Sequence, residues 1–211
     1  MKLDTAASMP INMQKAIDAT ITTLIAGGQA ERAMKAGERA PAFRLPDSAG
    51  RIVRSADLLA AGPLVLAFYR GSWCSYCRLD LEALQASYKE IQSWGASLVV
   101  VSQQTPKQNR IAQLDLKIDF PMLSDKGGVL AELFGIRFAL PSSVRPVFKA
   151  LDVELPAMNG EASWTLPMPA RYVIARDGKI AYSEINPDYT QRPEPDELFP
   201  ILRRLTSSAA A

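Results

Sequence analysis

Residues 64–77 read Leu-Val-Leu-Ala-Phe-Tyr-Arg-Gly-Ser-Trp-Cys-Ser-Tyr-Cys, a short apolar run followed by the pair Cys74-x-x-Cys77. The run 64–69 is almost unbroken in apolarity and rich in β-forming residues, which is typical of a strand buried on both faces of a parallel sheet. Beyond the cysteines, apolar residues recur largely at three- and four-residue spacings, which predicts a helix; they are Leu79, Leu81, Leu84, Tyr88 and Ile91. The two cysteines are therefore expected at a strand-to-helix turn and in the first turn of the helix.

This position favours reactive thiols. Unpaired backbone N–H groups and the positive end of the helix dipole stabilise a thiolate there. Cysteine pKa values at such sites fall to roughly 3.5–7.5 from about 8.5, and the thiolate is the nucleophile. Cys74 and Cys77 are thus the candidate catalytic residues.

Other uses of the pair are less favoured. A structural zinc site takes four Cys or His ligands, whereas the chain has two cysteines and no histidine, so no metal or other cofactor is expected. A disulfide that closes a four-residue loop constrains little of the unfolded chain. Two inert core thiols remain an alternative. Because histidine is absent, Cys-His and Ser-His catalysis are excluded, and dipoles with Lys or Arg must activate the thiolate.

Composition indicates a domain of the size of an enzyme, without the strong net charge that would point to a nucleic acid or a membrane as a partner. The chain has 211 residues, 48% of them hydrophobic, enough for one core, and a formal charge of +2 from 24 basic and 22 acidic residues. No nucleic-acid or membrane partner is expected. The first residues, Met1-Lys2-Leu3-Asp4, lead into no apolar stretch long enough for a signal sequence or a span. We therefore expect a cytoplasmic location, where a cysteine pair is more often redox-active than structural.

The rest of the chain alternates between strand and helix patterns. Residues 11–35 predict one or two helices with a break at Gly27-Gly28, packed on the domain itself or forming a homodimer contact. Strands are expected in a hairpin over 43–53, at 64–70, at 97–102 and at 120–123, and in a late hairpin that joins 171–175 to 179–183. Helices are expected from the cysteines to residue 94, after Pro106, at 129–134 and at 196–205. This alternation predicts βαβ units. Residues 141–167 lack a clear period and predict a functional flap or an edge-covering loop.

Several of these segments resemble known families. The order strand, Trp-Cys-x-x-Cys, helix and a late proline before a hairpin resembles the thioredoxin fold. Residues 40–45 (Ala-Pro-Ala-Phe-Arg-Leu) and 66–74 (Leu-Ala-Phe-Tyr-Arg-Gly-Ser-Trp-Cys) resemble the peroxiredoxin superfamily of alkyl hydroperoxide reductase and thiol-specific antioxidant proteins. The resemblance is greatest to its subgroup with a Cys-x-x-Cys motif, whose members carry a tail similar to 188–195 (Asp-Tyr-Thr-Gln-Arg-Pro-Glu-Pro), and it spans roughly residues 37–205.

The resemblance implies an α/β, thioredoxin-like fold of peroxiredoxin type, with a central mixed sheet flanked by helices. Residues 1–36 would then be an N-terminal helical extension and residues 37–211 the thioredoxin-like domain. It also implies a thiol peroxidase that reduces hydrogen peroxide or organic hydroperoxides through a Cys74–Cys77 dithiol/disulfide cycle. A cellular thiol, namely thioredoxin, glutaredoxin or glutathione, would restore the dithiol. Two alternatives stay open: a thiol-disulfide reductase, and a redox-sensing binding protein without catalysis.

The two family patterns assign the sulfurs differently. Peroxiredoxins place the peroxidatic cysteine at Cys77, with Thr or Ser at the position of Cys74, Pro at that of Arg70 and an active-site Arg at that of Pro169. Thioredoxins make Cys74 the exposed nucleophile and Cys77 the resolving thiol, with a cis bond before Pro169. We expect Cys77 to attack peroxide, with Arg70 and Arg171 replacing the missing polar partners. We also expect the Met168–Pro169 bond to be cis and to lie close to the two cysteines, as the thioredoxin resemblance implies.

A substrate pocket is expected around these residues. Its candidate walls are Trp73 and Tyr76, which core packing would explain equally well, together with Arg70, Pro169 and Arg171. Asp80 and Glu82, early in the helix, are expected mainly to complement its dipole.

Overall fold

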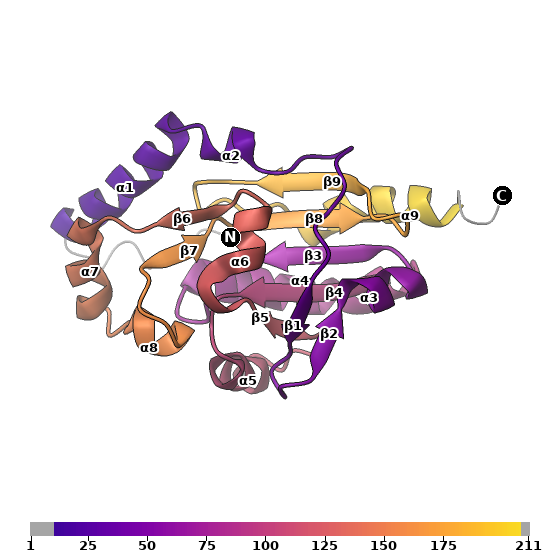
Figure 1. The fold of residues 1–211 in the computed structure, drawn as a ribbon, viewed down its shortest axis with the longest axis horizontal. Coiled ribbons are helices and arrows are strands. Elements are labelled where there is room, and N and C mark those ends of the chain that lie inside the picture. Colours follow the sequence, from indigo (N-terminus) through magenta and orange to yellow (C-terminus); the bar gives the residue numbers. More distant parts are fainter. Residues whose placement is uncertain (1–10, 208–211) are drawn as a thin grey trace.

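The structure of the protein is a computed structural model, which describes residues 11–207, with side chains from residue 15 onward. Its centre is a mixed five-stranded sheet with the strand order β5-β4-β3-β8-β9 (Figure 1). Parallel pairing joins β3 to β4 and β4 to β5, whereas β8 pairs antiparallel to β3 and to β9. The strands are β3 Leu64–Phe68, β4 Ser97–Ser102, β5 Met122–Ser124, β8 Ala170–Ile174 and β9 Ile180–Ile185. This confirms the predicted central mixed sheet and the late hairpin.

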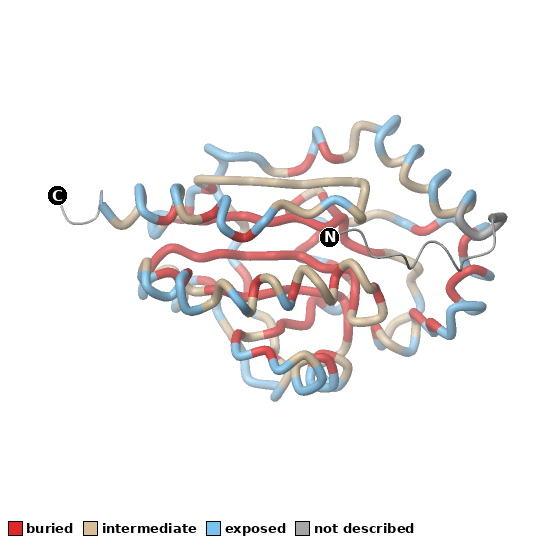
Figure 2. Tube along the Cα trace, turned by 180° about the vertical axis from the view of Figure 1, so that it is seen from behind, coloured by how far each residue is buried: buried red, intermediate tan, exposed pale blue. Residues whose placement is uncertain are grey.

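Both faces of the sheet are covered, which explains why β3 is apolar at every position. Leu64, Leu66 and Phe68 pack into one core, and Val65 and Ala67 pack into the other, as the two-residue period of a strand requires. Figure 2 shows most of the sheet buried, and the edge strand β9 at intermediate exposure along most of its length. The covering helices are α2 Gln29–Arg32 and α6 Val129–Leu133 on the first face, and α4 Ser75–Ser93, α5 Pro106–Asp115 and α9 Phe199–Ser207 on the second.

The helices next to the site begin as their sequences predict. Helix α4 follows the loop after β3 and has Cys74 as its N-cap residue. Helix α5 begins after Thr105, whose hydroxyl accepts a hydrogen bond from the backbone N–H of Gln108, with Pro106 in the first turn. The units β3-α4-β4 and β4-α5-β5 therefore bring the carboxyl ends of three parallel strands to one edge of the sheet.

The remaining elements surround this sheet. A hairpin of β1 Arg44–Pro46 and β2 Ile52–Arg54 agrees with the prediction. Helix α3 Ser55–Ala61 was not predicted, and a 3₁₀ turn at Pro195–Leu198 precedes α9.

The segment 141–167 is more regular than a loop. It holds a 3₁₀ turn at Ser142–Val144 (η3), helices α7 Arg145–Ala150 and α8 Leu155–Asn159, and strand β7 Thr165–Pro167, which pairs with β6 Arg137–Ala139. The sequence predicted a functional flap or an edge-covering loop here and did not show these short elements. Elements of three to six residues are shorter than two helical turns, so they leave no readable period. They enclose a small core with Leu140 and Phe148, against which Trp73 packs.

Helix α1, Ile11–Ala26, ends before the predicted break at Gly27-Gly28 and lies beside η3 at one end of the molecule (Figure 1). Figure 2 shows it half-buried on one side and exposed on the other. No helix in residues 11–207 has the length and apolarity needed to cross a membrane.

Candidate active site

Cys74 and Cys77 lie where the sequence predicted, at the carboxyl edge of the sheet. Cys74 precedes the first residue of α4, and Cys77 lies in its first turn. Both thiols are free and buried, with Cys74 4% exposed and Cys77 0% exposed. A substrate must therefore approach through a narrow opening or through movement of the surrounding side chains.

The loop that leads to Cys74 is shaped by Gly71. This residue has a φ of +152°, a conformation that side-chain-bearing residues rarely adopt. A Cβ there would lie 2.3 Å from Nε1 of the Trp73 indole. Glycine thus lets the indole lie directly against the backbone before the first cysteine. The backbone N–H of Ser72 donates to Oε1 of the buried Gln104, at 2.8 Å, which ties this loop to the end of β4.

Cys74 carries the more acidic thiol. A hydrogen bond from the Cys77 side chain lowers its pKa most; burial opposes the shift, and the positive charges of Arg70 and Arg192 add to it. The result is a pKa of about 6. Cys74 is therefore mainly a thiolate at neutral pH.

Cys77 has the opposite tendency. Burial raises its pKa well above the ordinary value, and its interaction with Cys74 raises it further, against the charges of Arg192 and Arg70. Like charges so close together disfavour a second ionisation. The reduced site thus pairs one thiolate with one thiol that hydrogen-bonds to it.

Arg70 places a buried cation beside the first sulfur. Its Nη1 lies 3.8 Å from the Cys74 sulfur, and Arg70 as a whole is only 7% exposed. The guanidinium stacks over the Tyr189 ring at 3.8 Å and faces the Trp73 ring at 4.9 Å. Nε of Arg70 has no hydrogen-bond partner among residues 11–207.

The second sulfur has its own cation, supplied from the C-terminal tail. Nη2 of Arg192 lies 3.7 Å from the Cys77 sulfur. Two local turns order this tail: Asn186 accepts from the backbone N–H of Asp188, and Asp188 accepts from that of Thr190. The tail thereby brings Tyr189 onto Arg70 and Arg192 onto Cys77.

A buried ion cluster anchors the tail to α4 and β8. Arg171 and Asp80 form an ion pair at 2.6 Å, with side chains only 3% and 10% exposed. The other carboxylate oxygen of Asp80 lies 3.7 Å from Nε of Arg192. Nη1 of Arg171 also donates to the carbonyl of Pro193. Asp80 thus fixes both arginines, and Arg192 in turn faces the sulfur.

Comparisons with known proteins agree with this arrangement. A model of the AhpC/TSA family matches residues 36–183. The chain belongs to the AhpC/TSA family. It is therefore a peroxiredoxin with a thioredoxin-like fold, as the sequence predicted.

Relatives of this peroxiredoxin cover about half of its length. Peroxiredoxin Bcp of Escherichia coli K12 is 32% identical over 104 residues, which are 49% of this chain and 65% of that protein. A Mycobacterium tuberculosis H37Rv protein named as a peroxiredoxin is 34% identical over 115 residues, 54% of this chain and 74% of its own.

Solved structures of the family share the fold. Peroxidoxin BcpB from M. tuberculosis superposes with a TM-score of 0.66 at 24% identity, over 82% of this chain and 98% of that one. One structure of Xanthomonas campestris peroxiredoxin Q gives a TM-score of 0.57 at 17% identity, over 79% and 91% of the two chains.

Among the predicted pocket residues of this peroxiredoxin, Arg70 and Pro169 line one cavity. Trp73 and Tyr76 pack against the cluster that contains both cysteines, and Tyr76 meets the ring of Tyr189 edge-on at 5.8 Å. Arg171 turns into the protein but towards Asp80 rather than towards a sulfur.

The prediction of a cis bond before Pro169 is wrong. Residues 11–207 contain no cis peptide bond. The chain runs extended from β7 into β8, and the backbone N–H of Met168 donates to the carbonyl of Ile136. Pro169 therefore bridges two strands of different sheets.

Three residues of the site escaped the sequence-based prediction, namely Asp80, Tyr189 and Arg192. Asp80 was expected only to complement the helix dipole. Tyr189 and Arg192 lie in the tail segment that carried part of the family resemblance, which was the one available signal for them.

Proposed function

We propose that this peroxiredoxin is a thiol peroxidase in which Cys74 attacks the peroxide and Cys77 resolves the product. The observation that carries the assignment is the asymmetry of the pair. The hydrogen bond from Cys77, aided by the charges of Arg70 and Arg192, lowers the pKa of the Cys74 thiol to about 6, whereas burial raises the pKa of Cys77. A reaction that needs one thiolate and one neighbouring thiol has both in place.

The cycle balances with a hydroperoxide and two reducing thiols. The Cys74 thiolate attacks one peroxide oxygen, the O–O bond breaks, and the leaving alkoxide or hydroxide takes a proton to give an alcohol or water. The resulting Cys74 sulfenic acid condenses with the Cys77 thiol, which forms the disulfide and releases water. Two equivalents of an external thiol then reduce the disulfide by exchange.

The charges around the sulfurs support this order of events. Nη1 of Arg70 lies 3.8 Å from the Cys74 sulfur. It can therefore donate a hydrogen bond to the oxygens of a peroxide that is positioned for attack by this sulfur. The proton that Cys77 shares with Cys74 becomes available when the sulfenic acid forms. Arg192, 3.7 Å from Cys77, then stabilises a thiolate on the resolving sulfur.

The sequence resemblance favours the opposite assignment, with Cys77 attacking. That assignment is a second candidate because Arg192 gives Cys77 a cation of its own. The thiol-disulfide reductase alternative likewise draws on an acidic Cys74 at a helix start. For the external thiol we propose thioredoxin, glutaredoxin or glutathione, and the homodimer, the cytoplasmic location and the division at residue 36 stay predictions.

Trapping the sulfenic acid in single mutants tests the assignment. We expect Cys77→Ser to react with hydrogen peroxide and then to be labelled by dimedone at Cys74, since its resolving thiol is gone. Cys74→Ser is expected to consume peroxide much more slowly than Cys77→Ser, because burial raises the pKa of the Cys77 thiol and keeps it protonated.

The opposite pattern would contradict the assignment. Fast dimedone labelling at Cys77 in Cys74→Ser, with an inert Cys77→Ser, makes Cys77 the attacking sulfur. If the wild-type protein instead ignores hydrogen peroxide and organic hydroperoxides but reduces a model disulfide, the peroxidase proposal fails and the reductase alternative stands.

A further inference from the structure

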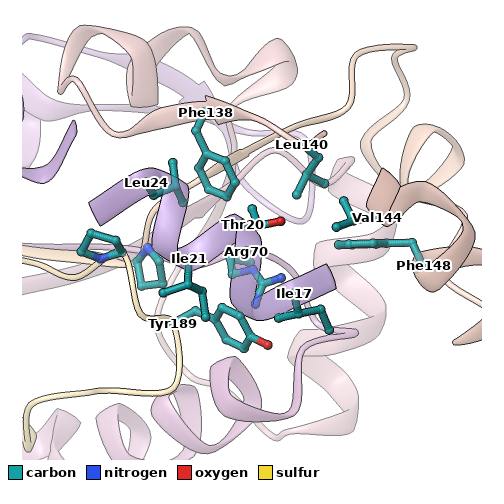
Figure 3. Close-up of a pocket in the computed structure, with 12 residues that line it drawn as sticks. Ile17, Thr20, Ile21, Leu24, Arg70, Phe138, Leu140, Val144, Phe148 and Tyr189 are labelled. Atoms are coloured by element: carbon teal, nitrogen blue, oxygen red, sulfur yellow. The ribbon is translucent and has the colours of Figure 1, made fainter. Parts of the chain in front are cut away.

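A small cavity leads from the surface of α1 to Arg70. Its volume is about 20 Å³, and its lining is almost entirely apolar. Figure 3 shows α1 crossing this cavity, with Ile17, Ile21 and Thr20 close to Arg70 and Tyr189. Among the described residues that line it, Arg70 is the one that carries a charge. One wall of the cavity is therefore formed by the residue whose guanidinium lies 3.8 Å from the Cys74 sulfur.

Helix α1 supplies one wall of the cavity from a single face. Ile17, Thr20, Ile21 and Leu24 are spaced by three and four residues, as neighbours on one helix face are, and all four line the cavity. All four are half-buried, while Ile25, at the edge of this face, is 56% exposed and does not line the cavity. Packing of α1 thus leaves part of its apolar face bordering the cavity.

The opposite wall of the cavity comes from the segment that runs from β6 to α7. Phe138 and Leu140 come from β6 and its end, and Val144 and Phe148 come from η3 and α7. Phe148 also meets the Trp73 ring at 5.2 Å, so this wall is held against the active-site loop. Helix α1 lies before residue 36, where the match to the family begins.

We propose that α1 acts as a size filter for the peroxide, with Ile17, Ile21 and Leu24 as specificity-determining residues. This inference rests on the proposed peroxidase function. The filter admits hydrogen peroxide to Arg70 and disfavours hydroperoxides that carry branched or aromatic groups. The three side chains touch the substrate's path and not the sulfurs.

The volume of the cavity indicates which peroxides the filter favours. A site needs roughly 10–15 Å³ of such volume to hold one water molecule, so about 20 Å³ accommodates a molecule little larger than water. Hydrogen peroxide has two heavy atoms. Cumene hydroperoxide adds a phenyl ring and two methyl groups, which fit only if the α1 side chains move. Shortening those side chains enlarges the cavity without changing the charge near Cys74.

Steady-state kinetics with a triple variant test the filter. The variant Ile17→Ala, Ile21→Ala, Leu24→Ala is compared with the matched control Ile25→Ala, an exposed residue of the same helix that does not line the cavity. For the triple variant we expect kcat/KM with cumene hydroperoxide to rise about tenfold relative to that with hydrogen peroxide, since a missing methylene in a pocket changes selectivity by roughly 10–200-fold. Ile25→Ala should leave the ratio unchanged.

A variant with a larger side chain in the α1 wall tests the filter by making the cavity smaller. Ile21→Phe reduces the cavity, so we expect slower reaction with hydrogen peroxide, by about tenfold, and an unchanged pH midpoint for alkylation of Cys74. If wild-type protein reduces hydrogen peroxide but neither variant changes the selectivity ratio, the filter is wrong while the peroxidase function stands. If wild-type protein prefers cumene hydroperoxide over hydrogen peroxide, the filter is also overturned. Loss of all peroxide reduction in wild-type protein instead refutes the proposed function.

Discussion

Replacing Arg70 by Met removes the cation that lies 3.8 Å from the Cys74 sulfur while keeping a side chain of similar length against Tyr189. Coulomb's law with an effective dielectric constant of about 20 gives roughly 4 kcal/mol as an upper limit for this interaction. Opposite charges at this range shift pKa values by about 1–3 units. Because Arg192 and the Cys77 hydrogen bond remain, we expect a shift in the lower half of this range, of about 1.5 units or about 2 kcal/mol.

The consequence depends on pH. A thiol with a pKa of about 6 is about 90% ionised at pH 7, whereas one with a pKa of about 7.5 is about 25% ionised. We therefore expect Arg70→Met to react with iodoacetamide about fourfold more slowly at pH 7 and at nearly the wild-type rate at pH 9. The pH dependence of alkylation, with the labelled sulfur located by mass spectrometry, measures the midpoint directly.

Arg78→Met is the matched control for this experiment. Arg78 lies four positions after Cys74, as Arg70 lies four positions before it, but the Arg78 side chain is 38% exposed and pairs with Asp115 at 2.7 Å. Its loss should leave the alkylation midpoint unchanged. An unshifted midpoint in Arg70→Met, or an equal shift in Arg78→Met, would refute the reasoning that the buried cation activates Cys74.

Two further predictions concern stability. Asp80→Asn leaves Arg171 buried without its partner, so urea unfolding should show a loss of about 3–5 kcal/mol, against less than about 1 kcal/mol for Asp115→Asn at the exposed pair. Burial raises the pKa of Asp47, but hydrogen bonds from the backbone N–H groups of Arg51 and Ala49 outweigh it and leave the pKa lowered. The ionised Asp47 should therefore stabilise the fold above its unfolded pKa of about 3.9. The difference in free energy of unfolding between wild type and Asp47→Ala should shrink as the pH falls below about 4. A difference that stays constant down to pH 2 contradicts this.

Local sequence determined the elements that carry the sulfurs. The run 64–69 and the helical spacing after Cys77 each contain enough residues to show their period, and both were found where expected, as β3 and α4. The position of Cys74 and Cys77 follows from that junction alone. The same reasoning found the five-residue α6 but missed α3, α7 and α8, because helices of less than about two turns seldom show a readable period.

Only the tertiary structure decided which groups surround the sulfurs. Arg192 reaches Cys77 from 115 positions away in the sequence, and Asp80 meets Arg171 across 91. Spacing along one helix or strand cannot reveal such contacts, since they depend on how the tail folds back over α4. Pro169 likewise aligned with two family patterns, and only the structure showed that the bond before it is not cis.

The place of α1 shows the same division. Its helical pattern and its break at Gly27-Gly28 were predicted from the sequence, as was the choice between packing on its own domain and a homodimer contact. That its half-buried face would border the cavity at Arg70 could not be predicted. An amphipathic pattern specifies that a face is covered but not by what, because apolar burial is non-directional and the shape of the partner surface selects the contact.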